Sequence, residues 1–199
     1  MGIGQSRAQR EAARRAGLPP VGMSGDSNVM SPPTQCFLSY AHADAQGFDS
    51  LLENLKPYAR IHNINLWHDR GIHAGSYWDN KIRQEVARSQ IFVLLTTNAF
   101  LGSEYVLKHE LPAIMHRHKH DNALIVPVIY RMCAWRGFFG DYIQVVPLDD
   151  RSRLRPVRDW RDPHAAMARA TDAISAAIQD WFGLPPPPSP FAASLGPNP

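Results

Sequence analysis

A single carboxylate, that of Glu110, stands in a setting suited to chemistry. It lies within residues 97–112, a stretch that follows an apolar run and leads into a predicted helix. The helix carries one apolar stripe, made by Leu107, Leu111, Ile114 and Met115. Glu110 falls one turn from members of this stripe, so its carboxylate is expected at the border between core and water, where burial perturbs an acid. The alternative is a surface glutamate paired with a lysine or histidine.

The residues around Glu110 qualify this expectation. Pro112 lacks a backbone donor and crowds the preceding turn, so the helix is expected to kink beside Glu110. A metal site is the competing chemistry, because four histidines follow closely: His109, His116, His118 and His120. His116 and His120 have the i, i+4 spacing of some zinc helices, but no nearby Glu or Cys completes the set. We therefore predict no metal.

Composition bounds the class of protein. The 199 residues are 44% apolar, enough for one domain with tails. The net charge of +3 is not concentrated in a basic run, so nucleic-acid binding is not indicated. No apolar run approaches the ~18 residues of a membrane span, and no apolar segment follows the N-terminal arginines, so neither a membrane anchor nor a signal peptide is expected. Cys36 and Cys133 are predicted to be free thiols of a cytoplasmic protein.

Composition shifts divide the chain into three parts. Residues 1–34 are rich in Gly, Ser, Pro and Arg and are predicted to be a disordered tail. Residues 35–183 carry the periodic apolar patterns of a folded domain. Residues 184–199 are predicted to be a Pro-rich tail.

Alternation of strand-like and helix-like segments predicts the fold within the domain. Five short strands are expected, at residues 36–40, 61–67, 91–95, 124–129 and 143–146. Helices are expected between them, one capped by Asp44 and ended by Pro57, one capped by Ser76, and a last one capped by Asp162. Pro127 implies an edge position or an irregularity in its strand.

Such a pattern predicts an α/β fold, a flavodoxin-like parallel sheet of order 2-1-3-4-5 with helices on both faces. Strand order reverses between strands 1 and 3, and ligands bind there, at the carboxyl ends of the strands. This topology brings the loop after strand 1, residues 39–44, to the same crevice as residues 103–110.

Five segments, in order, resemble the TIR (Toll/interleukin-1 receptor) domain family in its bacterial form. Residues 37–44, FLSYAHAD, resemble the first-strand motif, and residues 67–78, WHDRGIHAGSYW, resemble the BB loop with Ala74 in place of the usual proline. Residues 103–112 resemble the S-x-[FY] … E-L-P pattern. Residues 126–129 and the C-x-W at 133–135 resemble the fourth strand and the segment after it. The likeness covers about residues 35–182 and neither tail.

The resemblance implies an activity. Many bacterial TIR domains cleave NAD+ at the nicotinamide–ribose bond, releasing nicotinamide with linear or cyclic ADP-ribose, and many serve in antiphage defence or signalling. The family's catalytic glutamate matches Glu110. NAD+ is then the substrate, and no cofactor is expected. Because nicotinamide leaves as a neutral molecule, no general acid is needed, and a fixed anion that stabilises an oxocarbenium-like sugar is enough.

The matching motifs also supply substrate-binding candidates. Those expected to shape the ring pocket are Phe37, Tyr40, Trp67 and Trp78, with core packing as the alternative for Phe37 and Trp78. Those expected to bind ribose or phosphate are Ser39, His42, Asp44 and Arg70. The remaining candidates come from the loop and helix motifs: Asp69, Ile72, Gly75, Ser103 and Tyr105.

Two other functions fit the same fold. A non-catalytic TIR scaffold would act through homotypic contacts and would need neither Glu110 nor the polar loop at 39–44. A phospho-acceptor receiver domain needs an aspartate at the end of strand 3, where this chain has Thr96-Thr97. The resemblance further implies homo-oligomers built through TIR–TIR contacts, and an effector or sensor protein as a further partner.

Overall fold

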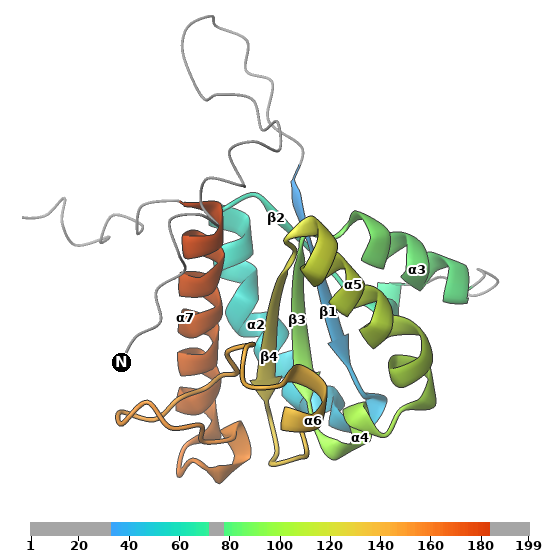
Figure 1. The fold of residues 1–199 in the computed structure, drawn as a ribbon. Helices are drawn as coiled ribbons and strands as arrows, with labels where there is room; N and C mark the ends of the chain where they lie inside the picture. The colour runs from blue at the N-terminus through green and yellow to red at the C-terminus, as the bar shows by residue number, and fades with distance from the viewer. Residues whose placement is uncertain (1–32, 72–77, 184–199) are drawn as a thin grey trace, which may run out of the picture. The chain divides into compact units, whose positions relative to one another are not determined.

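The computed structural model describes residues 33–71 and 78–183. Its centre is a parallel sheet of four strands in the order β2-β1-β3-β4 (Figure 1). The strands are β1 (Thr34–Tyr40), β2 (Ile64–Trp67), β3 (Ile91–Thr96) and β4 (Leu124–Ile129). Phe37 of β1 lies opposite Trp67 of β2 on one side and opposite Phe92 of β3 on the other, which fixes the register of these three strands. The predicted parallel α/β sheet is confirmed.

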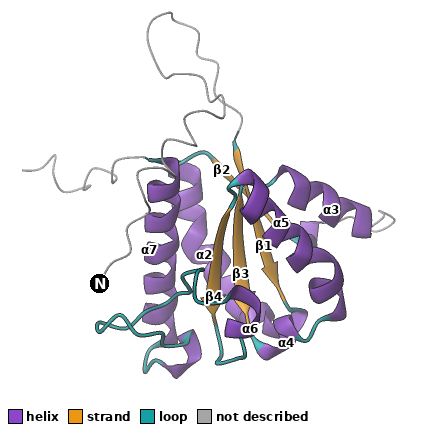
Figure 2. Cartoon of the chain, in the orientation of Figure 1, coloured by secondary structure: helices purple, strands orange, loops and turns teal. Residues whose placement is uncertain are grey.

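Helices cover both faces of this sheet, as predicted (Figure 2). One face is covered by α2 (Ala45–Ile61) and α7 (Pro163–Phe182), and the other by α3 (Trp78–Arg88) and α5 (Leu111–Asp121). The short elements are η1 (His42–Asp44), η2 (Asp69–Gly71), α4 (Asn98–Leu101), η3 (Val106–Glu110), α6 (Arg136–Phe139) and η4 (Val157–Asp159). Among the described residues, no helix is long and apolar enough to cross a membrane.

The predicted fifth strand at 143–146 is wrong. Within the described ranges this segment makes only one parallel bridge, Val128 to Val146, beside β4. The chain turns at 141–143 just before the bridge. Pro147 comes next and has no N–H to continue a ladder. The sheet therefore stops at four strands in the order 2-1-3-4, and the five-stranded order is not formed.

Pro127 shows how β4 serves as the edge of this sheet. Its carbonyl accepts a hydrogen bond from the Val146 N–H on the outer side of the strand. The N and C=O of one strand residue point the same way, so the missing N–H of Pro127 also faces outward. The expected edge position is thus confirmed.

Two predicted helix ends differ from the structure. α2 continues through Pro57 to Ile61, because its last turns pack Leu55 and Ala59 into the core and Tyr58 donates to the Ser175 carbonyl of α7. Asp44 precedes α2 but does not cap it, because its carboxylate is occupied elsewhere. By contrast, Asp162 accepts from the N–H groups of His164 and Ala165, which confirms the predicted cap of α7.

The stretch before α5 contains the irregularity predicted beside Glu110. Val106–Glu110 forms one wide π-turn, in which the Leu111 N–H bonds to the Val106 carbonyl five residues back. Pro112 follows at the start of α5 and cannot donate to the preceding turn. Such wide turns hold one residue more than an α-helical turn and are frequent at functional sites.

Some predictions about chain organisation concern residues that the structure does not describe. The predicted tails, 1–34 and 184–199, fall almost wholly outside them, as does the Ser76 cap. Cys36 is buried and Cys133 half-buried, and both are free thiols, as predicted.

Candidate active site

Glu110 and Ser39 meet at the carboxyl end of β1. Ser39 is the next-to-last residue of β1, and its hydroxyl donates a 2.5 Å hydrogen bond to Glu110 Oε2. Glu110 is only 7% exposed. In the described part of the chain no lysine, arginine or histidine forms an ion pair with it. The paired surface glutamate considered above is therefore not what the structure contains.

The surroundings of Glu110 favour its neutral form. Burial is the largest cause and raises the pKa of Glu110 above its ordinary value, and the charge of Asp69 adds to the increase. The Ser39 hydroxyl opposes both by stabilising the carboxylate. A buried carboxylate without a countercation is costly, and a cationic ligand beside it would relieve that cost.

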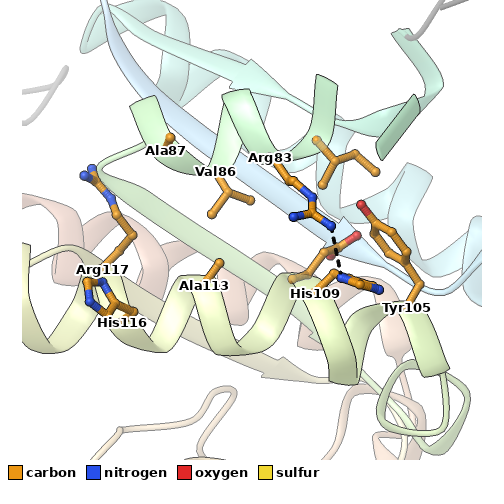
Figure 3. Close-up of a pocket in the computed structure, with 10 residues that line it drawn as sticks. Arg83, Val86, Ala87, Tyr105, His109, Ala113, His116 and Arg117 are labelled. Carbon is orange, nitrogen blue, oxygen red and sulfur yellow. Dashed lines mark hydrogen bonds between the residues drawn. The ribbon is translucent and has the colours of Figure 1, made fainter. Parts of the chain in front are cut away.

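A cavity of about 270 Å³ opens beside Glu110, between α3 and the helix that contains it. Its walls are largely apolar and are made by Ile82, Val86, Ala87 and Ala113 (Figure 3). Tyr105, Arg83 and His109 lie at the Glu110 end, and His116 and Arg117 at the other (Figure 3). The cavity thus combines one acid, apolar walls and several cationic or imidazole groups.

Aromatic rings and hydrogen bonds fix the Glu110 end of this cavity. Tyr105 donates a 2.8 Å hydrogen bond to Asp79, and its ring lies 4.3 Å from that of Trp78. Burial raises the pKa of Tyr105 well above its ordinary value, so the phenol stays protonated. Arg83 donates to His109 Nδ1 at 3.3 Å and pairs with Asp79 at 2.9 Å. Trp78 remains 40% exposed and so is available to a ligand.

Polar groups after β1 and β2 form a second cluster. Arg70 donates to the Tyr40 hydroxyl at 2.7 Å and also pairs with Asp49. Its guanidinium lies over the Tyr40 and Phe48 rings, which stack on each other. His42 Nε2 lies 3.2 Å from Asp69 Oδ2. Arg70 thus holds β1, α2 and η2 together.

Three predicted site residues lie in structural positions. Phe37 is 2% exposed and stacks on Trp67 at 5.0 Å in the core beneath α3. Asp44 is buried and accepts a 2.6 Å hydrogen bond from Thr97 at the end of β3. Ser103 accepts from the Val106 N–H and so supports the start of the wide turn.

The structure therefore joins some candidates and separates others. Ser39 and Tyr105 lie beside Glu110, and Trp78 packs against Tyr105, whereas Tyr40 and Arg70 belong to the second cluster, linked to Glu110 through the charge of Asp69. Ile72 and Gly75 lie outside the described residues. No group of three or more His, Cys, Asp or Glu suited to a metal ion occurs among the described residues.

Sequence reasoning missed the α3 side of the cavity. Arg83, Val86 and Ala87 line it, and Asp79 holds Tyr105. The i, i+4 spacing of Asp79 and Arg83 was the one signal available, but it also fits an ordinary surface ion pair.

Comparisons with known proteins agree with the architecture. The TIR domain family model matches residues 36–169, well over half of the chain. The chain therefore belongs to the TIR domain family. It is 31% identical over 141 residues to the uncharacterized protein y4lF of Sinorhizobium fredii (strain NBRC 101917 / NGR234), across 71% of this chain and 42% of that protein. The chain thus spans less than half the length of this relative.

A solved structure gives a weaker likeness. The TIR domains in the structure of the activated Roq1 resistosome directly recognizing the pathogen effector XopQ are 16% identical to this chain. The match covers 73% of this chain and 84% of that one, with a TM-score of 0.42.

Proposed function

We propose that this protein is an NAD+ nucleosidase that cleaves the nicotinamide–ribose bond, with Glu110 as the catalytic carboxylate. NAD+ is the substrate, and no cofactor takes part. The observation that carries the proposal is the isolation of Glu110: it is 7% exposed, it lines a cavity, and within residues 33–71 and 78–183 its carboxylate is held only by the Ser39 hydroxyl. A buried acid arranged in this way is a mark of functional sites.

The bond to be broken matches this arrangement. The nicotinamide ring of NAD+ is a cation and leaves as a neutral molecule, taking the C–N electron pair. Positive charge then moves to the ribose, where a fixed carboxylate in a poorly hydrated site stabilises it. Glu110 needs to donate no proton. The Ser39 hydrogen bond fixes the carboxylate and lowers its pKa, which opposes part of the effect of burial.

The lining of the cavity is consistent with a dinucleotide. Tyr105 offers a ring for stacking, with the ring of Trp78 packed against it outside the lining, and Arg83 with His109 offers donors for phosphate oxygens. At about 270 Å³ the cavity is smaller than the usual ~300–1,000 Å³ of ligand pockets, so one protomer accommodates only part of NAD+.

Self-assembly completes the proposal. A second copy, meeting the first through a TIR–TIR contact, would cover the rest of the substrate. Activity should then rise with protein concentration, and an effector or sensor partner would control assembly during a bacterial defence or signalling response. A head-to-tail contact of this kind is heterologous and builds open filaments.

The test is chromatography of NAD+ after incubation with concentrated protein, with light scattering recorded alongside. We expect nicotinamide and ADP-ribose or its cyclic form from the wild type and neither from Glu110→Gln. Constant specific activity from a species that stays monomeric would contradict the assembly step and leave the chemistry intact. Full cleavage by Glu110→Gln would contradict the role of Glu110.

A non-catalytic scaffold is the second candidate. The Ser39–Glu110 hydrogen bond favours it, because a carboxylate whose oxygen is satisfied within the core also suits a purely structural role. In that case the wild type releases no nicotinamide at any concentration, while light scattering still reports TIR–TIR assembly.

A further inference from the structure

An imidazole–carboxylate pair lies close to the Ser39–Glu110 site. His42 begins η1, three residues after Ser39, and Asp69 begins η2, directly after β2 and His68. Asp69 Oδ2 lies 3.2 Å from His42 Nε2, so the carboxylate orients the ring through that nitrogen. No described residue bonds to Nδ1, which leaves this atom for a second partner.

The two members of the pair differ in their environment. The His42 side chain is 78% exposed, whereas that of Asp69 is 18% exposed. Asp69 Oδ1 is buried and has no hydrogen-bond partner among the residues that the structure describes. The neighbouring cation, Arg70, pairs with Asp49 instead. His42 is therefore the only described cation-forming group that the structure pairs with Asp69, and the pair has one buried end and one end in solvent.

Asp69 also connects the pair electrostatically to Glu110, because its charge is among the causes that raise the pKa of Glu110. Both members of the pair also follow the carboxyl ends of neighbouring parallel strands, His42 after β1 and Asp69 after β2, at the end of the sheet where Ser39 contacts Glu110. The His42 side chain takes no part in the packing of the core: among the described residues, its ring contacts the Tyr40 ring edge-on and the Asp69 carboxylate.

Hydrolysis needs a group that Glu110 is poorly placed to supply. Once nicotinamide has left, the oxygen of a water molecule attacks the sugar, and that water must lose a proton. Glu110 is engaged by Ser39 and by the positive charge of the sugar. A histidine oriented by a carboxylate and open to solvent suits the task, as in other general-base pairs.

We propose that His42 is the general base of the hydrolytic step and that Asp69 is its positioning residue, an inference that rests on the proposed NAD+ cleavage. The C–N bond breaks and its electron pair leaves with neutral nicotinamide. The water oxygen forms the new C–O bond to the anomeric carbon, and its proton passes to His42 Nδ1 and then to solvent. The sum is NAD+ and water giving nicotinamide, ADP-ribose and one proton.

Competition between two nucleophiles tests this role. A pyridine base such as 3-acetylpyridine attacks the same sugar intermediate, but it has no proton to lose and so needs no base. The measurement is the ratio of ADP-ribose to the exchanged dinucleotide at a fixed concentration of 3-acetylpyridine. Because both products come from one intermediate, the ratio does not depend on how fast that intermediate forms.

We expect His42→Gln to lower this ratio by about 100-fold, the size of a typical general-base contribution, and Asp69→Asn to lower it in the same direction. Free imidazole should restore hydrolysis to His42→Ala, because the position is open to solvent. The matched control is His164→Gln, an exposed histidine in the first turn of α7, which should leave the ratio unchanged.

Each contrary result has a distinct meaning. If His42→Gln lowers both products equally, His42 binds substrate and the general-base role is overturned. If only Asp69→Asn leaves the ratio unchanged, Asp69 is not the positioning residue. If the wild type releases nicotinamide by neither route, the proposed function is overturned, and this inference with it.

Discussion

The two faces of the sheet differ in how their helices pack. On one side, α2 and α7 close over the sheet with a continuous apolar layer that includes Phe48, Leu51, Met167 and Ile174, each no more than 1% exposed. On the other side, α3 and α5 leave a cavity of about 270 Å³, and the carboxylate of Glu110 is buried beside it. Figure 3 shows side chains of both helices that line this cavity. One sheet therefore supports a closed face and an open face.

The contrast shows where stability and chemistry reside. Close packing excludes water and has no room for a ligand, so the α2–α7 face stabilises the domain. The α3–α5 face has its own buried apolar cluster, but it also leaves a cavity and buries the carboxylate of Glu110, both of which cost free energy of folding. Damage to the first face should thus appear as lost stability, and damage to the second as lost activity.

The largest expected effect is on the open face. Glu110→Gln keeps the hydrogen bond from Ser39 but removes the charge, and it should lower nicotinamide release by at least about 10³-fold, as removal of an electrostatic stabiliser does. Chromatographic product analysis measures the loss. Glu104→Gln, an exposed residue paired with Lys108, is the control and should retain full activity.

The same variant should not lose stability. The pKa of Glu110 is raised on folding, so the stability this group contributes at low pH is lost as the pH rises through its unfolded and then its folded pKa. Glu110→Gln removes that loss, and its melting temperature at neutral pH should equal or exceed that of the wild type. A large drop would mean that the carboxylate is structural.

The next effect is on the closed face. A Cβ added to Gly47 in α2 would lie 2.5 Å from Cζ of Tyr130, so one of the two must move. We expect Gly47→Ala to lower the free energy of unfolding by about 1–3 kcal/mol, measured by urea denaturation, with activity of the folded fraction unchanged. Gly137→Ala is the matched control, because nothing lies within 4 Å of its added Cβ. Equal effects at both positions would contradict the close contact.

The third effect is on pH dependence. If Glu110 acts as a carboxylate, as proposed, kcat/KM should fall about tenfold per pH unit below its pKa, with the midpoint above that of an exposed glutamate. Ser39→Ala removes the hydrogen bond that lowers this pKa, so the midpoint should move to higher pH. Melting curves at each pH show that the protein stays folded. If Ser39→Ala does not change the midpoint of the pH profile, the profile does not report the titration of Glu110.

The smallest effect is expected at the cavity wall. Ala113→Leu adds volume on an exposed wall position and should change the free energy of unfolding by less than about 1.5 kcal/mol. The leucine side chain should fill part of the cavity in which we propose that NAD+ binds, so KM for NAD+ should rise several-fold. Ala170→Leu, at a fully buried position of α7, adds the same atoms to the closed face and should instead destabilise. Unchanged KM would place the substrate elsewhere.

Local patterns in the sequence predicted the parallel sheet well. The β3 run is buried at every residue, and Asp162 caps α7 through neighbouring N–H groups. Predictions failed where a distant residue decided the outcome. Asp44 has the type and place of a cap, yet the hydroxyl of Thr97, 53 residues away, takes its carboxylate. Pro147, directly after the predicted fifth strand, lacks the N–H that would continue a ladder beside β4.

The candidate site likewise has a part that the sequence predicted and a part that it did not. Topology and motifs predicted that Ser39 and Glu110 would share a crevice, and their side chains do touch. The α3 wall of the cavity depends on how α3 packs beside α5, and no local sequence pattern predicts that packing. Arg83 and Val86 could therefore be found only from the packed structure.

The wide turn at Val106–Glu110 has a consequence for tolerated changes in chain length. In a regular helix, residues five apart such as Tyr105 and Glu110 would differ by about 140° in direction, whereas residues four apart differ by about 40°. The wide turn absorbs the extra residue, and both side chains line one cavity. Deleting one residue between them should regularise the helix and keep Glu110 in place, whereas deleting one just after Glu110 would turn it by about 100° against the α5 core. A one-residue deletion should therefore be tolerated just N-terminal to this glutamate and not just C-terminal to it.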